Sequence, residues 1–102
     1  MSIFEGYSDS YDADARLTIL RALKDEPGHT LNDNMLLAEI KRYGFRRGTE
    51  YLFEQLFWLE KASAVKLHRA GTVIVTELAH AGVQHLTRDK LLFGIKPPSQ
   101  PR

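Results

Sequence analysis

The spacing of the apolar residues changes once along this chain, just before position 65. In residues 46–61, leucines recur every three or four positions, which places them along one side of an α-helix. Residues 65–69 (VKLHR) instead alternate apolar and polar side chains, and residues 72–76 (TVIVT) are rich in β-branched residues, as β-strands are. Ala70 and Gly71 separate the two runs and favour a tight turn. The chain is therefore expected to pack helices against one small β-hairpin.

Four helices are expected, three before the hairpin and one after it. Ser10 or Asp12 can cap the first, and residues 27–28 (Pro-Gly) end it because proline cannot continue the helical hydrogen bonds. Asn32 is a favourable cap for the second helix, and Gly44 is its expected stop. The expected ranges are about 11–24, 33–43, 46–61 and 77–88. The expected inner faces consist of Leu17, Ile19, Leu20, Leu23, Leu36, Leu37, Ile40, Leu52, Leu56, Leu59, Val83 and Leu86.

The length of 102 residues suits one domain with a single modest core. Residues 1–10, rich in Ser, Asp and Gly, are predicted to form a flexible N-terminus, and the folded domain is predicted over residues 11–90. Residues 91–102 change from an apolar run (LLFGI) to a segment with three prolines (KPPSQPR). The proline-containing part of this C-terminal tail, residues 96–102, is therefore expected to be disordered.

The composition excludes several kinds of chemistry. The chain has no cysteine, hence no disulfide, thiolate zinc site or cysteine nucleophile. His80 and His85 lie five positions apart on an expected helix and point to different faces, so no metal site is expected. No catalytic constellation is visible, and we expect neither an enzyme nor a cofactor. No apolar run is long enough to span a bilayer and no secretory signal is visible, so we expect no membrane association and a cytoplasmic location.

The order of the expected elements resembles that of a known family. The likeness is carried by LLAEIKRYGFRRGTEYLFEQLFWLEKASAVKL at 36–67 and by TVIVTELAHAGVQHL at 72–86. These segments resemble the winged helix-turn-helix family of bacterial and phage regulators, and more narrowly the small winged-helix proteins of Mu-like prophages. Leu78 and Gly82 match the segment that closes the wing, whereas Ala79 stands where that family usually has Thr. The resemblance implies a mainly α fold with a small β-hairpin, in the order α-α-α-β-β-α, and a DNA-binding regulator of transcription.

Basic residues surround the expected corner between the second and third helices. With a net charge of +1, affinity for double-stranded DNA must come from such a local patch. In a DNA-bound winged helix this corner and the wing lie near the phosphates. The alternative is that these are ordinary solvated charges, and that Lys and Arg on the hairpin discourage strand aggregation. The expected DNA-binding residues are Lys41, Arg42, Arg46, Arg47, Thr49, Glu50, Lys66, His68 and Arg69.

The third expected helix is less suited to DNA beyond its first turn. Over residues 46–61 three basic residues are balanced by Glu50, Glu54 and Glu60. Phe53 and Phe57, four positions apart, are expected to contact the core or a second copy of the chain. This charge balance leaves a second hypothesis open, in which the chain is a protein-interaction or structural module that binds a phage or host protein, for example in phage assembly.

Apolar residues at the two ends of the chain lie outside the expected core. A small winged helix does not need them for its own folding, and terminal segments of this kind commonly dock across a two-fold axis. We therefore expect a homodimer. Its expected interface residues are Phe4, Leu91, Leu92 and Phe93.

Overall fold

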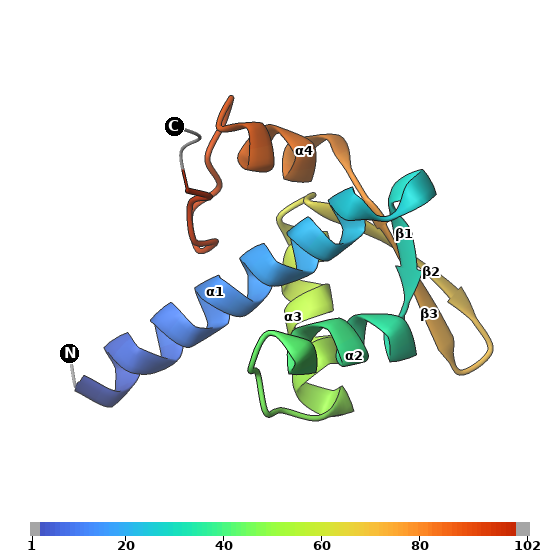
Figure 1. The fold of residues 1–102 in the computed structure, drawn as a ribbon, viewed down its shortest axis with the longest axis horizontal. Coiled ribbons are helices and arrows are strands. Elements are labelled where there is room, and N and C mark those ends of the chain that lie inside the picture. The colour runs from blue at the N-terminus through green and yellow to red at the C-terminus, as the bar shows by residue number, and fades with distance from the viewer. Residues whose placement is uncertain (1–2, 100–102) are drawn as a thin grey trace.

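Four α-helices and a small antiparallel sheet make up the computed structural model, which describes the backbone of residues 3–99 and the side chains of residues 9–99 (Figure 1). Helix α1 contacts the other three helices, with α2 and α3 on one side of it and α4 on the other in this view. The elements are α1 (Ile3–Asp25), the 3-10 turn η1 (Pro27–His29), β1 (Thr30–Asn32), α2 (Asp33–Arg42), α3 (Thr49–Lys61), β2 (Val65–Ala70), β3 (Val73–Leu78) and α4 (His80–Thr87).

The sheet has three strands in the order β1-β3-β2, and both pairings are antiparallel. The β2–β3 hairpin confirms the predicted change of period. Strand β1 was not predicted, because three residues are too short to show an alternating pattern. It pairs with β3 through Leu31 opposite Thr76, so the mainly helical fold carries one strand more than the expected hairpin.

The predicted leucine stripes form the core. The side chains of Leu20, Leu36, Leu52, Leu56 and Leu59 are completely buried where the helices meet. Burying one such side chain stabilises the folded state by about 2 kcal/mol relative to leaving it exposed. The remaining predicted inner residues of the helices are buried or half-buried as well.

Helix α1 begins at Ile3, so the structure has helical backbone over residues 3–10, where a flexible segment was expected. The Ser and Asp residues there favour caps and turns, which is why a loop was expected. However, each residue added to an existing helix gains one hydrogen bond for one residue fixed. Starting a helix is unfavourable because several residues must be fixed for the first hydrogen bond. Ala15, Ile19 and Leu23 anchor α1 in the core, and the helix extends from that anchored part.

The other helix ends test the predicted boundaries. The Asn32 side chain caps α2 by accepting a hydrogen bond of 2.8 Å from the backbone N–H of Met35, as predicted. Helix α3 begins at Thr49, so Arg46 and Arg47 precede the helix rather than start it. Helix α4 begins at His80, because strand pairing with β2 continues through Leu78.

The C-terminal tail is ordered where the structure describes it. Ile95 and Pro98 are buried, and the backbone N–H of Lys96 donates to the carbonyl of Ala13 in α1 at 3.1 Å. The Arg88 side chain donates to the carbonyl of Pro98. The prediction of disorder for the proline-containing segment is therefore wrong for residues 96–99, since proline composition does not reveal docking onto a distant helix.

We expect Thr76→Val to raise the free energy of unfolding by about 1 kcal/mol. Thr76 lies in the central strand β3, its side chain is completely buried, and its hydroxyl has no hydrogen-bond partner within the described residues. Valine has nearly the same shape and removes the unsatisfied hydroxyl. Urea denaturation measures the effect, and Thr30→Val in the edge strand β1 is the control, with an expected change below about 0.5 kcal/mol. A loss of stability in Thr76→Val would show that the hydroxyl is satisfied in solution.

Candidate nucleic-acid interface

Residues 43–48 form the corner loop, the connection between α2 and α3. Gly44 has a φ of +96°, which other residues rarely adopt, and it ends α2 as predicted. Phe45 then turns back into the core, where its ring lies 5.1 Å from that of Tyr11, and its N–H donates to the carbonyl of Ile40. Because Phe45 anchors the loop, the next two side chains, Arg46 and Arg47, extend into solvent.

Lys41, Arg46 and Arg47 are the corner cations. All three are exposed, and none forms an ion pair with an acid in the described part of the chain. The guanidinium of Arg47 lies 4.2 Å from the centre of the Tyr51 ring. Tyr51 donates a hydrogen bond of 2.6 Å to Asp12, and burial, followed by this bond, raises the pKa of its hydroxyl. Arg47 is therefore positioned by a fixed, uncharged aromatic ring.

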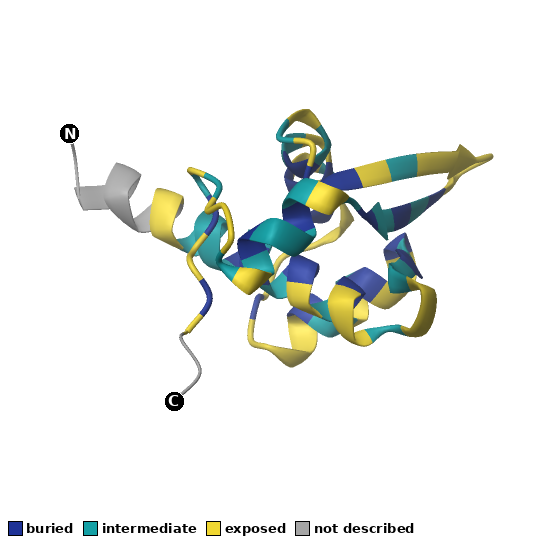
Figure 2. Cartoon of the chain, turned by 90° about the horizontal axis from the view of Figure 1, so that it is seen from above, coloured by how far each residue is buried: buried dark blue, intermediate teal, exposed yellow. Residues whose placement is uncertain are grey.

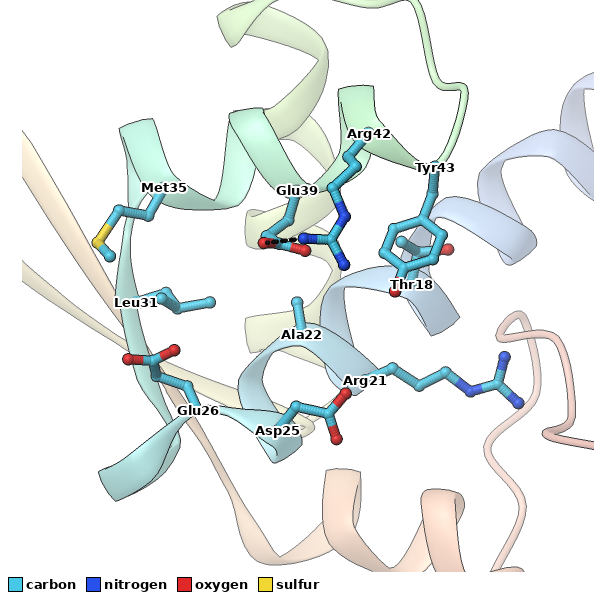
Figure 3. A pocket seen from close by; sticks show the side chains of 10 residues that line it. All are labelled: Thr18, Arg21, Ala22, Asp25, Glu26, Leu31, Met35, Glu39, Arg42 and Tyr43. Carbon is cyan, nitrogen blue, oxygen red and sulfur yellow. Dashed lines mark ion pairs between the residues drawn. The ribbon is translucent and has the colours of Figure 1, made fainter.

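Arg42 differs from the three corner cations because its charge is paired with an acid. Its guanidinium lies 3.7 Å from the Glu39 carboxylate and points into a hollow between α1 and α2, whose floor includes Ala22 and Leu31 (Figure 3). The hollow contains more acidic than basic side chains. Arg42 is therefore partly neutralised, although the sequence had placed it in the DNA-binding set.

The N-terminus of α3 lies at the same corner. Gly48 is its N-cap and has no side chain to accept hydrogen bonds from the first backbone N–H groups. Thr49 is the first residue of the helix rather than its N-cap. A shallow hollow lined by Lys41, Phe45, Arg46, Arg47 and Gly48 opens beside this end. Uncapped N–H groups and the helix dipole attract anions.

The exposed face of α3 carries mixed charge and one aromatic ring. Its members are spaced by four, three and four positions and are Glu50, Glu54, Phe57 and Lys61. Phe57 is 40% exposed, whereas Phe53 beside it is half-buried against the core, with a ring-to-ring distance of 6.2 Å. Glu50 and Glu54 leave this face with a net negative charge beyond the corner.

The β2–β3 hairpin is exposed toward its tip, but two of its three basic residues are paired with acids (Figure 2). The His68 ring lies 2.9 Å from the Glu77 carboxylate on β3. Arg69 lies 3.8 Å from the Glu60 carboxylate on α3 and also covers the Phe57 ring. Lys66 remains exposed, opposite Glu77 in the register. The hairpin therefore presents less unpaired positive charge than its sequence implies.

We expect the Glu77 carboxyl to titrate at lower pH than an ordinary glutamate. The hydrogen bond from His68 is the main cause that lowers its pKa, and the charge of Lys66 contributes less. Because the pKa is lower in the folded state, the stabilisation is present above the ordinary glutamate pKa and is lost as pH falls through the folded value. In an NMR titration, His68→Ala should move the Glu77 midpoint up toward its ordinary value, and Lys66→Ala should move it less. Equal midpoints in wild type and His68→Ala would contradict this.

The two histidines of α4 and the residues predicted for a dimer interface do not form a single site. His80 is exposed and His85 is buried, so the two histidines are not brought together. Leu91 and Phe93 are exposed and Leu92 is half-buried, while the side chain of Phe4 lies outside the described residues. Within residues 3–99, no helix combines the length and the hydropathy needed to cross a bilayer.

Sequence reasoning missed a cluster formed by Arg16, Trp58 and Gly94. The Arg16 guanidinium lies 3.9 Å from the Trp58 ring centre and donates to the carbonyl of Gly94 at 2.9 Å. Burial lowers the pKa of Arg16. These residues come from α1, α3 and the tail, and no local pattern connects them.

No protein-family model, no curated protein and no solved structure matches the chain. The likeness to winged-helix proteins therefore rests on the quoted residues and on the element order. That order, with β1 between α1 and α2 and the hairpin after α3, is compatible with a winged-helix fold.

Proposed function

We propose that this chain is a DNA-binding regulator of transcription with a winged helix-turn-helix fold, of the kind found in Mu-like prophages. The observation that carries the proposal is the cluster of unpaired, exposed cations Lys41, Arg46 and Arg47 beside the uncapped N-terminus of α3. Phosphate oxygens accept hydrogen bonds from both guanidinium groups and helix N-terminal N–H groups. The corner is thus the part of the surface best suited to the DNA backbone.

The elements are expected to contribute unequally to DNA binding. The corner cations hold phosphates, and Thr49 and Glu50 in the first turn of α3 lie closest to the base edges. Lys66 supplies one unpaired cation from the wing, whereas His68 and Arg69 must exchange an acidic partner for a phosphate. Because Glu54 follows on the exposed face, the body of α3 contributes little, and affinity should depend strongly on salt.

The Arg46→Ala/Arg47→Ala double variant should bind DNA at least about tenfold more weakly than wild type at moderate salt. Removing two phosphate contacts should also lower the slope of log affinity against log salt by about two. Fluorescence anisotropy with a duplex from the upstream region of its own gene measures both quantities. The matched control is Lys24→Ala/Lys90→Ala, which removes the same charge from exposed positions outside the corner. If both double variants lost the same DNA affinity, the loss would follow from net charge alone, and the corner would not be the DNA-binding site.

A protein-interaction module is the second candidate, favoured by the acidic and aromatic face of α3. An exposed phenylalanine beside Glu54 and Lys61 suits a protein partner, such as a phage or host protein, better than it suits phosphates.

Glu54→Lys separates the two candidates. If α3 lies against DNA, exchanging this acid for a base should strengthen DNA binding and steepen the salt dependence. If α3 binds a protein, the variant should leave weak DNA binding unchanged, and Phe57→Ser should abolish capture of the partner. Stronger DNA binding by Glu54→Lys, together with the loss in the arginine double variant, would exclude the second candidate.

A further inference from the structure

Phe93, in the segment after α4, has the most exposed apolar side chain in the described residues. Its relative exposure is 102%, and Leu91 beside it is 45% exposed. A fully solvated phenyl ring next to a second apolar side chain typically marks a contact surface.

The backbone on both sides of Phe93 is fixed. The N–H of Leu92 donates to Nδ1 of the buried His85 at 2.9 Å, and the carbonyl of Gly94 accepts from Arg16 at 2.9 Å. Gly94 has a φ of +94°, and a Cβ there would lie 2.5 Å from the Trp58 ring. The ring is therefore presented on an ordered backbone, which reduces the entropy lost when it is bound.

A hollow of about 390 Å³ lies beside Phe93, between α1 and the tail. It is lined by Ser10, Ala13, Asp14, Gly94, Ile95, Lys96 and Pro97. Most of the lining is apolar or backbone, and an apolar cavity of about 150 Å³ already accommodates benzene. A phenyl ring therefore fits this hollow.

The ring and the hollow are arranged for a two-fold contact. Gly94 lines the hollow and directly follows Phe93, so Phe93 and the hollow are neighbours on the surface. Asp14 and Lys96 on the rim are oppositely charged, and their side chains are only loosely paired at 4.0 Å. Opposite charges on one hollow are self-complementary, because a two-fold axis can pair Asp14 of one copy with Lys96 of another in both directions.

We propose that a second copy of this chain occupies the hollow, each copy inserting Phe93 into its partner. The contact is small, because two phenylalanines bury on the order of 300–500 Å². An interface of this size belongs to the weak, reversible class. Leu91 is part of the interface, whereas the Leu92 side chain packs against the core of its own subunit.

Sedimentation velocity over a range of concentrations tests the proposal. Wild type should shift reversibly from monomer to dimer, and Phe93→Ala should raise the dissociation constant at least tenfold. Because the Phe93 side chain is fully exposed and packs against none of the described side chains, the melting temperature of Phe93→Ala should be unchanged. Phe57→Ala, which removes an exposed ring from α3, should dimerise as wild type does.

A mixing experiment tests whether Phe93 of one copy enters the hollow of the other. Ala13→Trp should fill it and weaken self-association, while leaving Phe93 free to enter another copy. Mixing Phe93→Ala with Ala13→Trp leaves one intact contact per heterodimer, so the mixture should associate more strongly than either variant alone. A mixture no stronger than its components, or a Phe93→Ala variant that dimerises as wild type, would overturn the proposal.

The charged rim provides a second route if Ala13→Trp does not fold. Asp14→Lys and Lys96→Asp should each weaken the dimer, and the double reversal should restore it. Failure of the double reversal to restore the dimer, or a wild type that stays monomeric at several hundred micromolar, would also overturn the proposal. These measurements contain no DNA, so their failure leaves the assignment of the corner cations unaffected.

Discussion

Gly82→Ala is expected to lower the free energy of unfolding by at least about 2 kcal/mol, although alanine is the better helix former by about 1 kcal/mol. Gly82 is buried in α4, where a Cβ would overlap the carbonyl oxygen of Ala64 and would lie 2.8 Å from Cδ1 of Leu78. The same Ala64 carbonyl accepts a hydrogen bond from Ala79 just before α4. Neither the backbone of residue 64 nor the start of α4 can move without breaking this bond.

Ala81→Gly is the matched control for this variant. It sits next to Gly82 in the same helix and should cost about 1 kcal/mol through helix propensity alone. Chemical denaturation of both variants gives the comparison. If Gly82→Ala proved neutral or stabilising, α4 would pack less closely on residue 64 than the structure shows.

His85→Leu is expected to cost roughly 2–4 kcal/mol, because it leaves two partly buried backbone groups without partners and removes a completely buried ring. Nε2 of His85 contacts the carbonyl of Lys96 at 2.9 Å, and a carbonyl can only accept, so this nitrogen carries the proton. Nδ1 accepts from the N–H of Leu92 at 2.9 Å. One neutral ring thus holds two points of the tail, and leucine can replace neither bond.

Amide hydrogen exchange distinguishes tail release from general destabilisation. In His85→Leu the N–H of Leu92 should lose its protection, while the amides of α3 retain theirs relative to global unfolding. His80→Leu, at an exposed position of α4, is the control and should leave the tail unchanged. Retained protection at Leu92 in the His85 variant would show that the tail is held by other contacts.

Local sequence patterns predicted the elements that are specified by residues lying close together in the chain. The spacing of Leu52, Leu56 and Leu59 predicted α3, Asn32 predicted the start of α2, and the alternation after residue 65 predicted β2. Each of these depends on residues within one or two turns of one another. The basic corner was visible for the same reason, because Lys41, Arg46 and Arg47 are close in sequence.

The features that the sequence did not predict share a different cause. Strand β1 exists because β3 offers it a partner more than forty residues later in the chain, as Leu31 opposite Thr76 shows. The tail is ordered because Ala13, Arg16 and His85 supply hydrogen bonds to it from α1 and α4. Propensity and composition report on neighbours in sequence, so neither could reveal these pairings.

The sequence by itself determined the helical segments, the hairpin and the basic corner, because hydrophobic period and local charge are properties of short stretches. Only the tertiary structure decided which charges remain available. It pairs Arg69 with Glu60 and His68 with Glu77, and it leaves Arg46 and Arg47 without an acidic partner among the described residues. Charge pairing depends on distances between residues that are remote in sequence, and folding alone sets those distances.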